Sequence, residues 1–422
     1  MDLNIIDIER FTVDLPFRTV SGRNMARELP HWSVFEICKV TLHGGAVGIG
    51  ETMTYYTWGR VSDEAVKRAW GKNAHEAMWD DSLGSGLQMA LFDAVGKALG
   101  VPIHALLGQK IRDRALLSWW AIDMPPDDWV SESQSAQKLG YTDFKTKGRP
   151  WQDVYAQMET LTAAMPPTFK VDLDFNDHLL DAERGIPVMQ ELERISPNFA
   201  ICESPIPQGD VEGGKKIQQA VKVQIAHHYG SPPVPVQLGE DLCDGFVVST
   251  SASRTLRQGA VAAEFDKPFW LQQVGSGITA AYSLHFAAVL SHATWPAVNC
   301  HQLFKRDLLA TPIQVADGTA PIPDEPGLGL EIDEEALRRF RLPKPYDEQP
   351  DPPRLIETSW PNGAKTYFST GNQMMGYGRS GNLPVMVHGV STRLIPDDGT
   401  ARWRDLHERA LQAPVNEGEP GA

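Results

Sequence analysis

Between about residue 115 and residue 302, short apolar stretches alternate with segments of helical periodicity. Eight of these stretches have the length of buried strands, and strands that alternate with helices predict a β/α barrel. A doubly wound sheet is the competing fold, but no GxGxxG turn follows the first strand. The predicted strands are 116–122, 143–147, 168–174, 200–204, 223–228, 243–248, 268–273 and 297–302, with helices at 153–164, 179–195, 251–265 and 280–292.

The first hundred residues mix strand and helix patterns, which predicts an α+β unit. Residues 83–99 follow the i, i+3, i+4 pattern up to Gly100, and we expect a packed helix there. Residues 16–30 carry three arginines with glycine and serine, and we expect a mobile loop. The stretches that alternate as strands are 5–15, 32–43 and 46–52.

Proline and glycine punctuate residues 311–345, which contain a short amphipathic helix at 333–340. A further extension follows. It opens with a proline- and acid-rich linker at 346–353, holds one predicted helix at 400–411, and ends in ten residues that we expect to be frayed. The predicted parts are an α+β domain (1–114), a barrel (115–310), a segment returning to the first domain (311–345) and the extension (346–422).

Length and charge narrow the class of protein. A chain of 422 residues is too long for one ordinary core, and its net charge of −15 argues against a nucleic-acid or anionic-membrane partner. The four cysteines lie far apart without zinc spacing, as reduced core thiols of a cytosolic protein do. The N-terminus lacks the pattern of a signal peptide and no 18-residue apolar run follows, so we expect a cytoplasmic protein.

Polar side chains gather at the carboxyl ends of the predicted strands, where barrels of this kind carry their functional residues. Lys145 and Lys147 share one face of the second strand, and Asp174, Glu203 and His228 end the next three. Taken alone, paired lysines are more often a solvated face. Two carboxylates and an imidazole at one mouth suit Mg²⁺, and two lysines beside a cation suit a carboxylate substrate. A lysine crowded by positive charge has a lowered pKa and can act as a base near neutral pH.

These motifs resemble the enolase superfamily, in its mandelate racemase and muconate-lactonising branch, over about residues 3–345. Lys145-Thr146-Lys147 is similar to its KxK motif, Asp174-Phe175-Asn176 to its DxN metal motif, and Glu203-Ser204-Pro205 to its second metal ligand. Residues 90–97, 48–51 and 326–329 resemble its hallmark helix, capping-domain turn and return segment. The resemblance implies an α/β fold: a TIM-like (β/α)7β barrel with an N-terminal α+β capping domain that C-terminal residues complete.

The resemblance also implies a third metal ligand on strand five, and two registers compete for it. The segment 234–240 looks like the family's usual strand and would supply Glu240, but it leaves too little chain for strands six to eight. The segment 223–228 places His228 one normal β/α repeat after Glu203 and lets the barrel close. We therefore expect one Mg²⁺ per subunit, held by Asp174, Glu203 and His228, with His227 as the runner-up for the third position.

The resemblance implies that Lys147 removes a proton α to a carboxylate and that Lys145 and Mg²⁺ stabilise the enediolate. We expect dehydration of a sugar acid to a 2-keto product, with Lys147 or His301 protonating the leaving hydroxyl. In the family's racemases a histidine on strand seven, supported by an aspartate on strand six, is the opposite base. Asp244 is available for strand six, but strand seven offers Gln272 and Gln273 in place of the histidine. This absence argues against two-base racemisation and favours chemistry with one lysine. A racemase or epimerase in the same fold is the first alternative, and a non-catalytic ligand-binding barrel is the second.

Substrate selection is expected from the arginine-rich segment 16–30 and from aromatic residues of the capping domain, among them Tyr56 and Trp58. The partner is a small carboxylate, and we expect a homo-oligomer. The residues predicted to contact the substrate are Arg23, Tyr55, Gln272 and Asn299.

Overall fold

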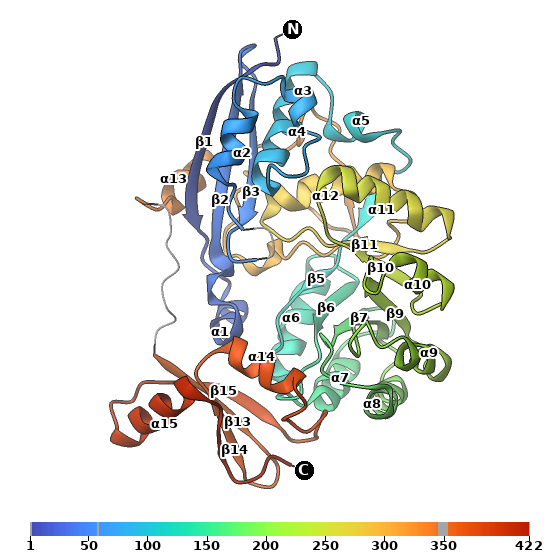
Figure 1. Cartoon of the computed structure of the whole chain (residues 1–422), viewed down its shortest axis with the longest axis vertical. Coiled ribbons are helices and arrows are strands. Elements are labelled where there is room, and N and C mark those ends of the chain that lie inside the picture. The colour runs from blue at the N-terminus through green and yellow to red at the C-terminus, as the bar shows by residue number, and fades with distance from the viewer. Residues whose placement is uncertain (1, 57–58, 345–352, 422) are drawn as a thin grey trace.

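The computed structural model describes residues 2–56, 59–344 and 353–421. A curled parallel sheet forms its middle, with an antiparallel sheet at the N-terminal side and another at the C-terminal side (Figure 1). Trp58 and residues 346–352 of the predicted linker lie outside the described residues.

The N-terminal part is an antiparallel sheet of order β1-β2-β3 with helix α4 packed on it. A Cβ atom at Gly48 would lie 2.0 Å from the carbonyl oxygen of Ala90, so glycine in β3 lets α4 approach at backbone distance. The three predicted strands and the predicted helix are confirmed. The elements are β1 Ile5–Asp14, α1 Thr19–Glu28, a 3-10 turn Pro30–Ser33, β2 Val34–Leu42, β3 Val47–Met53, α2 Asp63–Ala69, α3 Ala74–Ala77, α4 Ser85–Leu99 and α5 Ile103–Leu107.

The expectation of a loop at residues 16–30 was wrong, because most of this segment forms helix α1. The buried face of α1 is polar, as Ser21, Asn24 and Arg27 show. Arg27 Nη2 donates to Asp123 Oδ2 at 2.6 Å, across 96 residues of sequence. The helix is thus held by tertiary ion pairs, which no local apolar pattern reveals.

Seven parallel strands form the barrel in the order β5-β6-β7-β8-β9-β10-β11. Strand two was predicted with the bounds that β6 has, and the fifth strand is β9 rather than the 234–240 segment, which contains helix α10. The elements are β4 Arg114–Leu116, β5 Trp119–Trp120, α6 Pro126–Lys138, β6 Asp143–Lys147, α7 Val154–Ala164, β7 Lys170–Asp174, α8 Ala182–Ile195, β8 Phe199–Glu203, α9 Val211–Ala220, β9 Gln224–His228, α10 Val234–Gly239, β10 Gly245–Val248, α11 Ala252–Glu264, β11 Phe269–Leu271 and α12 Gly277–Val289.

The barrel closes through single bridges, so the prediction of a full eighth strand at 297–302 was wrong. Ala297 bridges to Leu117, and Val298 bridges to Gln272. Cys300 then takes a left-handed φ of 63° and turns the chain into a short 3-10 helix. The first predicted strand is likewise divided: β5 joins the barrel, whereas β4 pairs with β12 (Thr319–Pro321).

Two buried carboxylates tie the N-terminal sheet to later parts of the chain. Asp93 accepts hydrogen bonds from the backbone N–H groups of Ile49 and Leu328 at 2.9 and 2.8 Å, which seats the returning segment on α4. Glu51 accepts the backbone N–H groups of Ser276 and Thr279 at 2.7 and 3.0 Å, which caps α12 of the barrel. The capping-turn and helix motifs are therefore explained by structural roles. The returning segment also carries α13 Glu334–Phe340.

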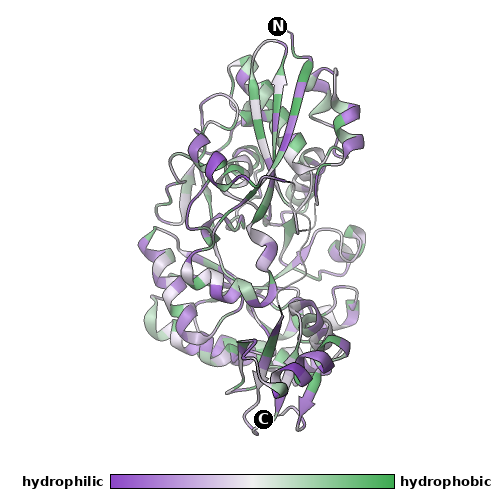
Figure 2. Cartoon of the chain, turned by 90° about the vertical axis from the view of Figure 1, so that its left-hand side faces the viewer, coloured by the Kyte–Doolittle hydropathy of each residue, from purple (hydrophilic) through white to green (hydrophobic). Residues whose placement is uncertain are grey.

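The C-terminal extension forms a four-stranded antiparallel sheet of order β15-β13-β14-β16 with two helices. The prediction of a single helix and a frayed end was therefore wrong, since β16 pairs with β14 near the C-terminus. Figure 2 shows this part at the lower end of the molecule, with purple positions prominent on its helices. Its elements are β13 Arg354–Ser359, β14 Lys365–Phe368, α14 Gly371–Arg379, β15 Ser391–Pro396, α15 Ala401–Gln412 and β16 Val415–Glu417.

The extension packs on the barrel through Trp151, which follows β6. The Trp151 side chain is fully buried in one apolar cluster with residues of the extension, among them Ile356 and Met374. Thr392 Oγ1 donates to the carbonyl oxygen of Trp151 at 2.7 Å. All four cysteines are free and buried, as predicted. None of the helices in the described residues has the length and apolar character needed to cross a membrane.

Candidate active site

A cavity of about 260 Å³ opens at the carboxyl ends of the barrel strands. Four parts of the chain line it: α1, the turn after β3, the strand ends and α14 of the extension. The barrel contributes the ends of β6, β7, β8 and β9 and the residues after β11. The polar residues that line the cavity are Glu28, Tyr56, Lys147, Arg149, Asp174, Asn176, Glu203, His228, Gln272, Asn372 and Arg379.

The two lysines of β6 make two separate ion pairs at 2.5 Å. Lys147 Nζ lies beside Asp174 Oδ2 and is 16% exposed. Lys145 Nζ lies beside Glu203 Oε2 and is 1% exposed, with the Trp270 ring 4.4 Å below its ammonium. Because the parallel register places Lys147 opposite Asp174 and Asp174 opposite Glu203, the strand pairing itself brings the charges together. Only Lys147 lines the cavity; Lys145 lies beneath it and acts through Glu203.

Burial and neighbouring charges shift the pKa values of the buried ionisable groups in different directions. Burial opposes ionisation of Glu203, but Lys145 and His228 outweigh it and lower the pKa of this carboxyl. Burial likewise opposes the charge of Lys145, and Glu203 and Asp174 reverse this and raise its pKa. Asp172 is also fully buried, and desolvation raises its pKa to about 8 in spite of Lys145. The Lys145–Glu203 pair therefore stays ionised, whereas Asp172 is protonated at neutral pH.

The third predicted ligand, His228, lies on the cavity wall with its Nε2 atom 3.0 Å from Glu203 Oε1. Its neighbour His227 faces the interior, where burial lowers its pKa to about 4. Glu240 lies on the outer surface and pairs with Lys215 at 2.8 Å. Of the two segments considered for strand five, only the one that ends at His228 places a side chain in the cavity.

Asp174, Glu203 and His228 are the residues that could hold a divalent cation. Both Glu203 oxygens are buried, and each lies beside a neighbouring nitrogen: Oε2 is 2.5 Å from Lys145 Nζ, and Oε1 is 3.0 Å from His228 Nε2. The described residues contain no group of three or more acid, histidine or cysteine side chains already arranged as a metal site. Asp174 is instead paired with Lys147. Two carboxylates and an imidazole nevertheless fit a divalent ion in donor type.

Arg149 is a residue of the site that the sequence reasoning missed. It is 2% exposed, and its Nη2 atom donates to Asn176 Oδ1 at 2.7 Å. Its position continues the alternation of Lys145 and Lys147 beyond the end of β6, which is the signal that could have found it. The α14 residues had no comparable signal, because their approach depends on the fold of the extension.

Of the residues predicted to contact substrate, one lines the cavity. Gln272 Nε2 lies 3.4 Å from Tyr56 Oη on the cavity wall. Asn299 is buried, and its amide donates to the carbonyl oxygen of Gln273 at 2.8 Å. Arg23 pairs with Asp128, and Tyr55 packs against a histidine ring.

His301, the other predicted proton donor, does not line the cavity. Its Nε2 atom lies 3.1 Å from Tyr141 Oη, and burial lowers the pKa of its imidazole to about 4. Asp244, the acid available on strand six, accepts the backbone N–H of Ile225 at 2.6 Å, near the amino end of β9. The structure therefore gives both residues positions away from the mouth.

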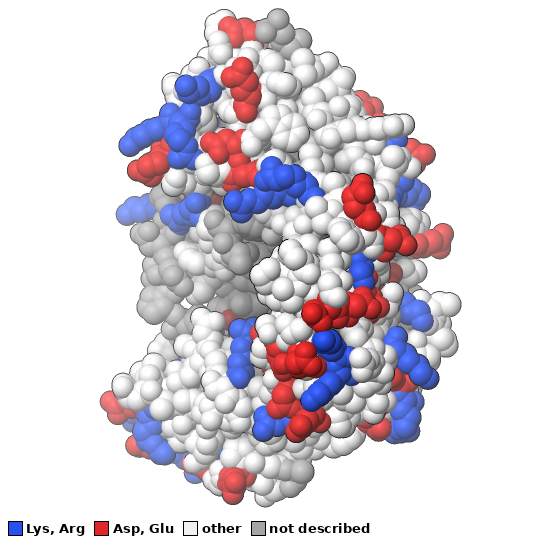
Figure 3. Space-filling model, turned by 45° about the vertical axis from the view of Figure 1, so that its right-hand side comes forward, with Lys and Arg blue, Asp and Glu red and all other residues white. Residues whose placement is uncertain are grey.

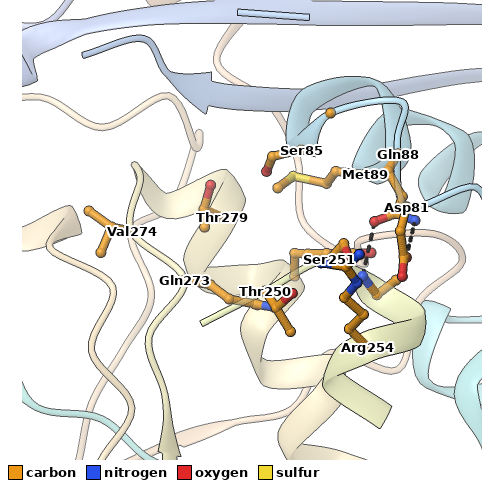
Figure 4. A pocket seen from close by; sticks show the side chains of 13 residues that line it. Asp81, Ser85, Gln88, Met89, Thr250, Ser251, Arg254, Gln273, Val274 and Thr279 are labelled. Atoms are coloured by element: carbon orange, nitrogen blue, oxygen red, sulfur yellow. Dashed lines mark hydrogen bonds between the residues drawn. The ribbon is translucent and has the colours of Figure 1, made fainter. Parts of the chain in front are cut away.

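A second, smaller cavity of about 130 Å³ lies between α4 and the barrel (Figure 4). Its polar groups mainly bind one another: Gln88 Nε2 donates to Asp81 Oδ1 at 3.1 Å, and Gln88 Oε1 accepts the backbone N–H of Ala252 at 3.0 Å. Figure 4 shows these side chains directed toward each other. The bond from Ala252 to Gln88 joins α11 of the barrel to α4 of the N-terminal part.

A family model described as enolase C-terminal domain-like matches residues 128–336. The matched residues include the barrel strands from β6 to β11. A probable glucarate dehydratase of Streptomyces coelicolor is 27% identical over 303 residues, covering 61% of this chain and 65% of the relative. A D-gluconate dehydratase of Thermoproteus tenax is 22% identical over 306 residues, covering 65% and 60%. The chain thus spans less than two thirds of the length of these two curated relatives.

Solved enolase-like structures share the fold. The muconate lactonizing enzyme of Pseudomonas fluorescens, solved with muconolactone, superposes with a TM-score of 0.66 at 24% identity, over 81% of this chain and 100% of that one. At this identity the likeness shows the fold alone. The predicted resemblance to the enolase superfamily and the predicted α/β barrel fold are confirmed, and the relatives are enzymes.

Proposed function

We propose that this enolase-like chain is a lyase that removes water from a sugar acid, with a proton α to a carboxylate abstracted first. The observation that carries the proposal is the position of Lys147. Its ammonium is the one lysine group that lines the cavity among the described residues, and it sits over the carboxylates of β7 and β8. The names of the acid-sugar dehydratases among the relatives support the same class of substrate.

In this proposal each residue of the site has one task. Lys147, in its neutral form, takes the α-proton through Nζ. Arg149 and the buried Lys145 keep the site positive, which favours a bound carboxylate and the negative charge that develops on it. Asp174, Glu203 and His228 would hold a divalent cation, Mg²⁺ in the first place, which when bound supplies further positive charge for the carboxylate.

The proton for the leaving hydroxyl comes from Lys147 in this proposal. His301 lies outside the cavity, and the cavity-lining residue after β11 is Gln272, an amide that cannot accept a proton at neutral pH. A site with a single amine base suits elimination better than the two-base inversion of a racemase. This contrast favours the dehydratase over the epimerase.

The test is a panel of acid sugars with added Mg²⁺, assayed for a 2-keto product in D₂O. A 2-keto product supports the proposal. Deuterium incorporation at the α-carbon without loss of water would make the chain a racemase or epimerase. No bound divalent ion and no reaction on any panel member would favour a ligand-binding barrel. We also propose that the protein works as a cytoplasmic homo-oligomer, which sedimentation and fractionation check.

A further inference from the structure

Helix α14 of the C-terminal extension forms one wall of the active-site cavity and carries Arg379 at its last residue. We infer that Arg379, together with Arg149, forms a subsite for a second anionic group of the substrate, so that the substrate is a dianion. The inference rests on the proposed function for the reacting end of the substrate. It goes further in giving the extension a role in choosing the substrate.

Asn176 joins the two guanidinium groups to the reacting end of the cavity. Arg379 Nε donates to its carbonyl oxygen at 2.9 Å, and Arg149 Nη2 donates to its side-chain oxygen at 2.7 Å. The backbone N–H of Asn176 donates to Asp174 Oδ1 at 2.8 Å, and Asp174 Oδ2 holds Lys147. Both arginines therefore contact a residue two positions after Asp174, the acid that pairs with Lys147.

Both guanidinium groups have donors left over. Arg149 is almost fully buried, and its Nε atom has no hydrogen-bond partner among the described residues. Arg379 binds Asn176 through Nε alone. Its terminal nitrogens make no hydrogen bond within the described part of the chain. A guanidinium fork with free N–H groups is the geometry that binds a carboxylate or a phosphate.

The acids near the two guanidinium groups are either already paired or disfavoured as anions. Burial opposes the charge of Asp123, but Arg27 and Arg149 lower its pKa, and Arg27 Nη2 pairs with it at 2.6 Å. Asp177 faces Arg379, but burial raises the pKa of Asp177 to about 6, so solvent exclusion already disfavours its charge. Glu28, across the cavity, has a pKa of about 8, raised by burial and by Asp123 beside it. The face of the molecule in Figure 3 carries acidic and basic side chains close together, without a large area of one sign.

Close backbone packing fixes α14 in this position. A Cβ atom at Gly371 would lie 2.7 Å from Glu28 Cα, and one at Gly378 would lie 2.9 Å from His178 Cδ2. Glycines near both ends of α14 therefore let it pack directly on α1 and on the loop after β7. Arg379 is held at the cavity by the rigid contact of the whole helix, not by its side chain alone.

The test compares dianions with matched monoanions. Glutarate and adipate carry two carboxylates and no hydroxyl to eliminate, whereas pentanoate and hexanoate carry one carboxylate. Calorimetric titration should show that Arg379→Met weakens binding of the dicarboxylates about 10- to 100-fold, the range for losing a charge-assisted hydrogen bond, and leaves the monocarboxylates unchanged. Arg379→Lys should restore part of the loss. Arg409→Met, an exposed arginine of α15, is the matched control and should change nothing.

Kinetics on the acid-sugar panel supply the second readout. For a dicarboxylic sugar acid, Arg379→Met should raise KM by the same factor with kcat nearly unchanged, and it should leave a monocarboxylic acid unaffected. A phosphate ester of the monocarboxylic acid shows whether the second group is carboxylate or phosphate. Equal effects on dianions and monoanions, or none, would overturn the subsite. Selective dianion binding without turnover would instead overturn the proposed reaction and keep the subsite.

Loss of the Asn176 contact could loosen α14, so stability is measured in parallel. Arg379→Gln keeps an N–H donor for the Asn176 carbonyl but has no charge. If Arg379→Gln retains the unfolding midpoint of the parent and loses dicarboxylate affinity, charge is responsible. If it retains both, the subsite is excluded.

Discussion

Lys145 and Glu203 form an ion pair of 2.5 Å in which neither side chain is more than 1% exposed. The pair lies under the cavity and joins β6 to β8 across β7. A buried pair contributes little net stability while it is intact, but removing one partner leaves an uncompensated charge in a medium of low polarity. The pair therefore constrains which substitutions the site tolerates.

Lys145→Met and Glu203→Gln should each lower the free energy of unfolding by roughly 3–5 kcal/mol. The double variant should lose less than the sum of the two, because neither charge is then left alone. Urea unfolding of the four proteins in a double-mutant cycle measures the coupling. Additive losses would show that the two side chains are stabilised independently of each other.

Lys147→Ala should reduce turnover by at least about 10³-fold while the fold is kept, because this side chain is partly exposed and supplies the proton-transfer group. Exchange of the substrate α-proton with D₂O should disappear with the activity. Circular dichroism and thermal unfolding serve as controls. Activity above a few per cent of the parent would place the base on another residue.

His301→Gln should leave kcat within about threefold of the parent, because His301 binds Tyr141 and lies outside the cavity. The glutamine keeps a polar partner for the tyrosine hydroxyl. The measurement is steady-state turnover beside Lys147→Ala. A loss as large as that of the lysine variant would return His301 to the role of proton donor.

His228→Ala should weaken Mn²⁺ binding by about 10-fold or more, whereas Glu240→Gln should leave it unchanged. The reason is geometric: the imidazole contacts Glu203 in the cavity, and Glu240 pairs with Lys215 on the outer surface. Titration of the metal into each variant gives the affinities. The reverse pair of results would restore a ligand set of three carboxylates.

Stability should fall as pH drops from about 6.5 toward 3, in part because of His285. Neutral His285 accepts the backbone N–H of His104 at Nδ1 and donates from Nε2 to Leu328, and burial lowers its pKa to about 3. The native state thus binds fewer protons than the unfolded chain, so acid favours unfolding, by up to about 5 kcal/mol for this group. Urea unfolding of His285→Gln should show a weaker pH dependence over this window. An unchanged slope would assign the acid sensitivity to other groups.

Local sequence patterns predicted the secondary structure correctly where a segment is stabilised by its immediate neighbours. The strand at Asp143–Lys147 and the helix ending at Gly100 follow from apolar spacing and a glycine stop. Helix α1 could not be predicted in this way, because ion pairs with distant acids compensate for its polar buried face. The prediction of the last barrel strand failed for a similar reason. Bridges at only two residues close the sheet, and the left-handed backbone conformation of Cys300 ends the segment.

The residues of the site likewise divide into those that the sequence predicted and those that it did not. The strand ends bring Lys147, Asp174 and Glu203 together because parallel pairing fixes their register. His301 and Asn299 were predicted on the assumption that strand eight continues to the mouth, and the chain turns before it does so. Arg379 depends on a sheet of the extension whose strands β13 and β15 pair across more than 30 residues, and no short window of sequence contains that information.

The extension has apolar clusters of its own and meets the barrel through Trp151 and the glycines of α14. Its free helix face and loops can therefore change without disturbing the strands that carry Lys147, Asp174 and Glu203. Under the proposed roles, substitutions in the extension change which substrate is bound, while the barrel strands keep the residues proposed for proton abstraction. Under the same proposed roles, grafting an extension of this kind onto a shorter barrel changes which acid is bound and leaves the barrel strands unaltered.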